Sequence, residues 1–107
     1  MRAFHHMGLP TDDKQPNEVW VEATRVWVTA PEDHPYKVEF LRYEPDSPVT
    51  GPIRDLPHMA WKTDDLEREV AGEKVILGPF EPYEGLKVVF IEQDGVAVEF
   101  MQFAVDS

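Results

Sequence analysis

The chain has 107 residues, which is enough for one domain with a buried core. It contains no cysteine, so disulfides, thiolate nucleophiles and cysteine-based metal sites are excluded, and any metal must be held by His and carboxylate groups. Ten Lys and Arg against 21 Asp and Glu give a net charge of −11, which argues against nucleic acid or a membrane surface as the partner. There is no apolar segment of the kind that begins a signal peptide and no apolar run long enough to span a bilayer, so we expect a cytoplasmic protein.

The first half of the chain is predicted to be almost entirely β-structure. Strands are expected over residues 2–9, 19–30 (as one strand or two) and 36–43, because these segments are rich in β-branched and aromatic residues. Pro16 discourages a helix after the first strand, so a turn, or at most a single helical turn, is expected there. Residues 31–35 predict the turn of a hairpin. Residues 46–54, with two Pro and one Gly and with Pro45 just before them, predict a linker.

The second half is predicted to contain one helix among its strands. Strands are expected over residues 56–62, 74–77, 87–92 and 96–103. A short helix capped by Thr63 or Asp64, with Glu67 placed for a capping-box contact to Asp64, is expected to end at Gly72. Residues 78–85 predict a loop, and Asp94-Gly95 predicts a tight hairpin turn.

The two halves also repeat one another. HMGLPTDD at residues 6–13 matches HMAWKTDD at residues 58–65, and VEFLRY at 38–43 matches VEFMQF at 98–103. The offset is 52 (58 − 6) for the first match and 60 (98 − 38) for the second, so eight residues (60 − 52) are missing from the interior of the first copy. We interpret the chain as two copies of one unit, the first with its helix cut down.

Each copy carries a His near its start and a Glu near its end, and these four residues are the candidate site: His6, Glu39, His58 and Glu99. If the copies pair about a pseudo-twofold axis, two imidazoles and two carboxylates converge, a set that suits a divalent first-row metal ion. Such a site leaves positions open for water or substrate oxygens. The alternative is that the His residues are ordinary core residues and the Glu residues face solvent. Both Glu residues share a strand face with apolar side chains, where an unpaired charge is costly, and this favours the metal site.

Other residues give weaker signals. Strand alternation predicts that His5 points away from His6, so His5 is interpreted as structural or exposed, and His34 as exposed in a turn. Tyr83 and Glu81 are the weakest functional candidates. The remaining aromatic and acidic candidates are interpreted as core, interface, turn or cap residues: Trp20, Trp27, Trp61, Phe80, Asp12, Asp13, Asp64 and Asp65. The sequence contains no phosphate-binding Gly loop, HExxH or GxSxG motif, so nucleotide, zincin and serine-hydrolase functions lack support.

The segments HMGL, PHMAWKTDDLE and the closing DGVAVEF resemble the vicinal oxygen chelate superfamily, which includes glyoxalase I, bleomycin-resistance proteins, extradiol dioxygenases and methylmalonyl-CoA epimerase. The resemblance covers nearly the whole chain. It implies an α+β fold in which two paired βαβββ modules form a curved mixed sheet, the first module with a reduced or missing helix. The single domain, 1–107, would comprise module one at about 1–45, a linker at about 46–54 and module two at about 55–105.

The resemblance also implies a site and a function. It assigns His6, Glu39, His58 and Glu99 as ligands of one Zn, Mn, Fe, Ni or Co ion, with Glu39 or Glu99 as general base. The implied activity is that of an isomerase or lyase that acts on a small oxygenated metabolite through a metal-stabilised enediolate. A homodimer is expected to cover the sheet face that the missing helix leaves exposed. The alternative function is that of a bleomycin-resistance protein, which sequesters a small molecule without metal chemistry.

Overall fold

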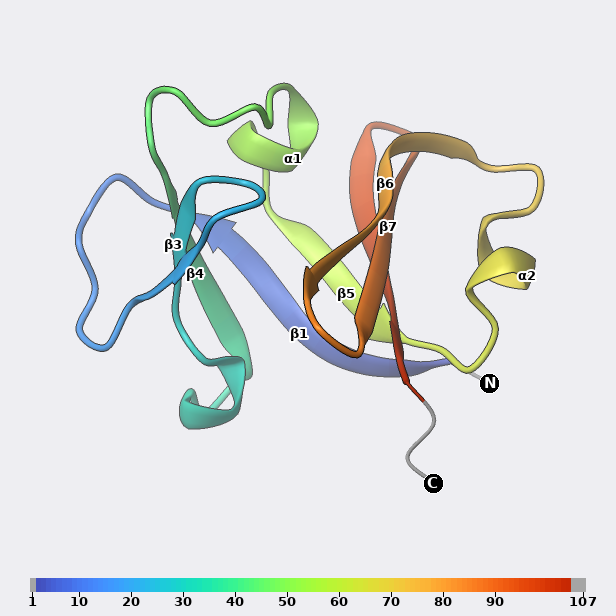
Figure 1. The fold of residues 1–107 in the computed structure, drawn as a ribbon, viewed down its shortest axis with the longest axis horizontal. Helices are drawn as coiled ribbons and strands as arrows, with labels where there is room; N and C mark the ends of the chain where they lie inside the picture. The colour runs from blue at the N-terminus through green and yellow to red at the C-terminus, as the bar shows by residue number, and fades with distance from the viewer. Residues whose placement is uncertain (1, 105–107) are drawn as a thin grey trace.

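The computed structural model describes residues 2–104 and shows a mostly β chain (Figure 1). Its strands are β1 (Ala3–Pro10), β2 (Val19–Val21), β3 (Val26–Val28), β4 (Val38–Tyr43), β5 (His58–Lys62), β6 (Lys74–Tyr83), β7 (Leu86–Gln93) and β8 (Val96–Phe103). Two short α-helices, α1 (Pro52–Asp55) and α2 (Leu66–Val70), and one 3₁₀ turn, η1 (Pro31–Asp33), complete the described elements. Among the described residues, no helix has both the length and the apolar character needed to cross a membrane.

All eight strands belong to one mixed sheet, in the order β2-β3-β4-β1-β5-β8-β7-β6. The two central strands, β1 and β5, are antiparallel. Each of them is parallel to its outer neighbour, β4 for β1 and β8 for β5. The sheet curls so that its two outer parts face one another across the central strands (Figure 1). The predicted curved mixed sheet is therefore present, with less helix than an α+β class suggests.

The first half follows the predicted pattern of strands. No helix occurs between Pro10 and Val19, and residues 19–30 form two strands, β2 and β3, that pair as a hairpin. Arg25 lies in the hairpin turn with a positive φ of 49°. Arg42 on β4 donates two hydrogen bonds to the carboxylate of Glu18, at 2.9 and 2.7 Å, and this ties the loop before β2 to the sheet.

The second half corrects two predictions. Asp65 caps α2, because its carboxylate accepts a hydrogen bond from the backbone N–H of Arg68. The predicted cap at Thr63 or Asp64, and with it the capping box with Glu67, is wrong. The predicted loop at residues 78–85 is also wrong, because β6 continues to Tyr83 along β7. Register shifts between the paired residues accommodate the two prolines on this edge strand.

The predicted tight turn between β7 and β8 is confirmed. Gln93 pairs with Val96, which leaves a two-residue loop. Asp94 and Gly95 both have positive φ, 54° and 81°, as a type I′ hairpin turn requires. This turn fixes the register of β8 against β7, and β8 carries Glu99 into the sheet.

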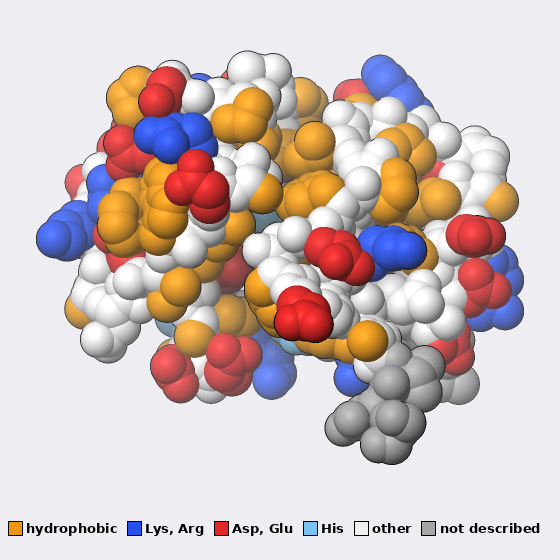
Figure 2. Space-filling model, in the orientation of Figure 1, with side chains coloured by type: hydrophobic (Ala, Val, Ile, Leu, Met, Phe, Trp, Pro, Cys, Tyr) orange, Lys and Arg blue, Asp and Glu red, His pale blue; other side chains and the backbone are white. Residues whose placement is uncertain are grey.

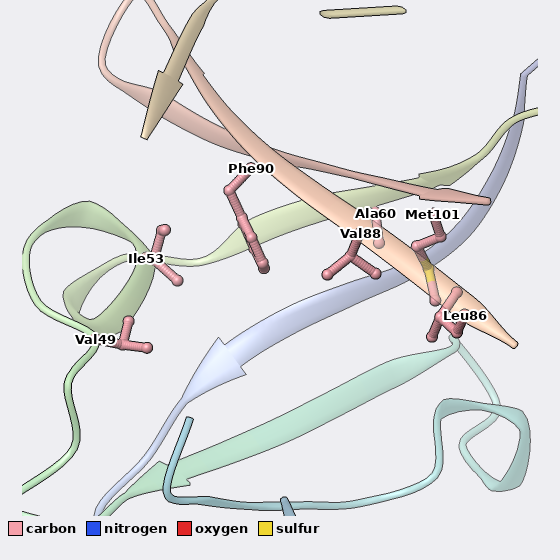
Figure 3. Packing of buried hydrophobic residues seen from close by; sticks show 7 residues of the cluster. All are labelled: Val49, Ile53, Ala60, Leu86, Val88, Phe90 and Met101. Atoms are coloured by element: carbon pink, nitrogen blue, oxygen red, sulfur yellow. The ribbon is translucent and has the colours of Figure 1, made fainter. Parts of the chain in front are cut away.

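Apolar side chains pack on both faces of β7. One cluster of buried residues faces the inside of the curl and includes side chains from the α1 segment, β5, β7 and β8 (Figure 3): Val49, Ile53, Ala60, Leu86, Val88, Phe90 and Met101. A second cluster packs beneath α2: Leu66, Val89, Ile91 and Phe100. Burial on both faces explains why β7 has an almost continuous apolar sequence rather than an alternating one.

Candidate metal site

Backbone pairing places the four candidate residues in two adjacent rows across the centre of the sheet. In each row a small residue lies between a His and a Glu on the neighbouring strands. Gly8 pairs with both His58 and Glu39, and Ala60 pairs with both His6 and Glu99. The register of β1 on β5 is centred on the pair Met7 and Met59, so the two rows are related by approximate twofold symmetry.

The small residues leave space for the imidazoles. A Cβ atom at Gly8 would lie only 2.1 Å from Cε1 of His58, closer than any real contact between such atoms. Ala60 is fully buried, so a longer side chain there would also have no free space. The small residue of the repeated HM motif was visible in the sequence, and the structure shows that it permits the His of the other half to lie over the sheet.

The four side chains converge at short distances. Nε2 of His6 lies 3.2 Å from Oε1 of Glu39 and 3.5 Å from Oε1 of Glu99. Nε2 of His58 is hydrogen-bonded to Oε1 of Glu99 at 3.1 Å. The ligand atoms of His6, Glu39 and His58 all lie within 4.8 Å of one another, so this group can hold a metal ion.

Burial makes this arrangement costly without a further partner. The exposed fractions of His6, His58 and Glu99 are 2%, 1% and 8%. Nε2 of His6 and Nδ1 of His58 are buried and have no hydrogen-bond partner, although two carboxylate oxygens lie near Nε2 of His6. An unsatisfied buried nitrogen costs about 1–3 kcal/mol. A divalent ion bound by His and carboxylate groups fits this donor set and would give Nε2 of His6 a partner.

The pKa values show strong coupling between the imidazoles and the carboxylates. Burial disfavours the protonated form of His6, but the carboxylates of Glu39 and Glu99 outweigh it and raise the pKa of His6 to about 9. Burial also disfavours ionised Glu99, but His58 and His6 outweigh it and lower the pKa of Glu99 to about 2. At neutral pH the metal-free site therefore holds a proton on His6 opposite an ionised Glu99.

His5 belongs to the site, and the prediction that it points away from His6 is wrong. The pairing of β1 with β5 shifts between Phe4 and His6, and this bulge breaks the strand alternation on which the prediction depended. Nδ1 of His5 lies 2.7 Å from Nδ1 of His6, and burial together with His6 lowers the pKa of His5. The sequence did contain one signal that could have placed His5 in the site, namely that it directly precedes His6 in a short strand.

A cavity of about 250 Å³ lies above the four side chains, between the outer parts of the sheet. His5, His6, Glu39, His58 and Glu99 form its polar floor, and apolar side chains form its walls. Figure 2 shows hydrophobic side chains in the hollow between the two halves of the molecule.

The structure separates the weaker sequence candidates. Tyr83 lines the cavity at its rim, with 59% of the residue exposed, whereas Glu81 does not line it. His34 also lies outside the cavity lining, where its Nδ1 accepts a hydrogen bond from the backbone N–H of Tyr36.

Comparison with known proteins shows the fold alone. No family model matches the chain, and no curated protein matches it. A crystal structure of hypothetical protein BH1468 from Bacillus halodurans C-125 is similar, with a TM-score of 0.68 and 17% identity over 99% of this chain and 97% of that chain. This likeness covers both halves of the sheet, so the arrangement of this chain recurs, at nearly full length, in a solved structure.

Proposed function

We propose that this chain is a glyoxalase-like protein that binds a divalent metal ion and acts as an isomerase or lyase on a small oxygenated metabolite. The observation that carries the proposal is the buried convergence of two imidazoles and two carboxylates beneath a cavity. His6, Glu39 and His58 would hold the ion, with Glu99 as the fourth ligand. Ions of the first transition series and Zn share a preference for this donor set.

The order of the strands supports the proposal of two paired modules. Read from either edge, the sheet runs through the second, third, fourth and first strand of one half: β2-β3-β4-β1 and β6-β7-β8-β5. Residues 1–45 and 55–105 would form the two modules, with residues 46–54 between them. α2 follows the first strand of the second half, and the first half has a turn at the corresponding place.

Glu39 and Glu99 differ in their suitability as the general base of the proposed reaction. A bound divalent ion would supply Lewis acidity toward an oxygen of the substrate. Glu39 is the better candidate for the general base, since its side chain is partly accessible and borders the cavity. Glu99 is a poorer base because it is bonded to His58 and its pKa is held at about 2. The apolar walls would exclude water from the proton transfer.

Elemental analysis tests the metal site. Protein that is purified without chelator, or reconstituted with Zn, Mn, Fe, Co or Ni, should retain about one ion per chain. His58→Ala and Glu99→Gln should lose it, whereas the matched controls His34→Ala and Glu73→Gln, outside the cavity lining, should keep it. Wild-type protein that takes up none of the five metals would contradict the proposal.

The apolar lining of the cavity favours sequestration of a small molecule as the second candidate function. A sequestering protein needs the cavity but not the ligand set. Tight binding of a small molecule that persists in EDTA and in His6→Ala would favour sequestration. Binding that is lost with the metal would favour the enzyme.

A further inference from the structure

We propose that the cavity takes an uncharged ligand with an apolar body, such as a ring, and disfavours ligands that carry a free carboxylate, phosphate or sulfonate. The inference rests on the proposed function in one respect, because it treats this cavity as the substrate site. It goes further in naming the chemical class that the walls accept.

The walls are apolar on both sides of the floor. One side comes from the hairpin of the first half, and the other from the strands β6 to β8 of the second half: Val19, Val21, Val26 and Val28 on one side, and Leu77, Phe80, Leu86, Phe90 and Met101 on the other. Burial of apolar ligand area against such walls is favourable in proportion to the area removed from water. A flat ring that spans the hollow would contact both sides, and a polar body would contact neither favourably.

The lining contains no Lys or Arg that could pair with an anion, and all of its residues belong to the described part of the chain. The ionisable acids of the lining are Glu32, Glu39 and Glu99. An anionic group would lose water and meet these carboxylates, while the one cationic ring of the floor, His6, is already paired with Glu39 and Glu99, so its entry is costly in a partly closed site.

The metal ion of the proposed function would not reverse this balance. An ion of charge +2 bound by two ionised carboxylates, Glu39 and Glu99, gives a sum of zero. The floor can therefore bind a ligand oxygen by coordination while leaving no net positive charge for a second, free anionic group. This distinguishes the cavity from sites that recognise phosphate with clustered Arg or Lys.

The volume of the cavity limits the size of the ligand. The cavity measures about 250 Å³ and opens to solvent at one side. Cavities of about 150 Å³ are known to hold benzene, so this one accommodates a ring with substituents. A longer apolar body would extend through the open side past Val19, which is 61% exposed, and Tyr83.

Two fluorescent probes test the ligand class: N-phenyl-1-naphthylamine and 1-anilinonaphthalene-8-sulfonate, which share one aromatic body and differ by the sulfonate. They should be titrated into EDTA-treated protein and into metal-loaded protein, at about 0.15 M salt so that the net charge of the chain is screened. The neutral probe should bind at least about tenfold more tightly in both forms. Val19→Lys adds a cation at the rim of the cavity. It should reduce the ratio of the two dissociation constants, sulfonated probe to neutral probe, by about fivefold or more.

Val96→Lys is the matched control, since it adds the same charge at another exposed valine, outside the cavity. It should leave the preference unchanged. Equal binding of the two probes, no binding of the neutral probe, or equal effects of the two Lys variants would each overturn the proposal. The titration of EDTA-treated protein does not depend on a metal. If the wild-type protein takes up no metal but still prefers the neutral probe, the proposed metal-dependent function is contradicted and the proposed ligand class is supported.

Discussion

His5 and His6 are joined through their Nδ1 atoms, which lie 2.7 Å apart, so one ring must donate its proton to the other. A metal ion on Nε2 of His6 would settle the direction, since that nitrogen must then lack a proton and Nδ1 must carry it. His6 would donate to His5, which would take the role that a carboxylate or carbonyl often has behind a metal-binding His. His5 is thus interpreted as a positioning residue.

His5→Phe should lower metal affinity by about 10–100-fold, because it removes the acceptor that orients His6. His5→Asn should bind metal nearly as well as wild type, since its amide oxygen can accept the same hydrogen bond. Competition against a chromophoric chelator measures both affinities, and melting temperatures of the metal-free variants check that the fold is retained. Equal affinities for the Phe and Asn variants would mean that the bond to His6 does not matter.

Gly8→Ala should lose metal binding and destabilise the fold by about 1–3 kcal/mol, because the new Cβ would force the His58 ring to move. The control is Gly72→Ala, where a Cβ meets no atom within 4 Å and the cost is limited to backbone strain at φ +77°. Denaturant unfolding and metal titration provide the two readouts. If Gly8→Ala binds metal as well as wild type, metal binding does not require the position of the His58 ring over Gly8.

Metal binding at pH 7 should release about one proton per ion, since the raised pKa of His6, about 9, keeps that ring protonated in the metal-free protein. Between about pH 7 and pH 9 the apparent affinity should therefore rise by about tenfold per pH unit. Calorimetric titration in two buffers of different ionisation enthalpy counts the protons. A count of zero would indicate that His6 is neutral before the metal arrives.

The metal-free protein should lose stability in both directions away from a window of mildly acidic pH. The pKa of His6 is raised from 6.5 to about 9, so its contribution is complete below pH 6.5 and disappears as the pH rises through 9. The pKa of Glu99 is lowered from 4.5 to about 2, so its contribution is complete above pH 4.5 and disappears as the pH falls through 2.

Melting temperatures of EDTA-treated protein should accordingly fall by several degrees from pH 6.5 to pH 9. His6→Gln should melt at a lower temperature at pH 6 and should show a flatter alkaline slope, because it lacks the titrating ring. His34→Ala serves as the control for loss of a His outside the site. An unchanged alkaline slope in His6→Gln would assign the titration to another group.

The sequence contained the main information for the fold and the site. Alternating β-branched and aromatic residues predicted the strands, and the repeat predicted that His6, Glu39, His58 and Glu99 would meet, as they do in the structure. These predictions succeeded because the local residue pattern placed each His and Glu on a strand and the repeat related those strands to one another.

Two of the failures, those at His5 and at residues 78–85, share a physical cause. A bulge between Phe4 and His6 changed the face on which His5 lies, and residue patterns do not encode such a shift. Register shifts also let β6 run through Gly78 and Pro79, where composition predicted a loop. Gly78 has φ +100°, and a Cβ there would lie 2.7 Å from the carbonyl oxygen of Val88, so this Gly permits close strand pairing rather than ending it.

The pairing of β1 with β5 has a consequence for the order of events in folding. Each row of the site draws residues from both halves, with Gly8 beside His58 and Ala60 beside both His6 and Glu99. Either half could close its own hairpins first, since those contacts are local and form quickly. The site exists only after the two halves have joined at the centre of the sheet. The rate at which refolding protein gains the ability to bind metal would therefore report when the two halves pair. The formation of strands within each half would be a separate, earlier event.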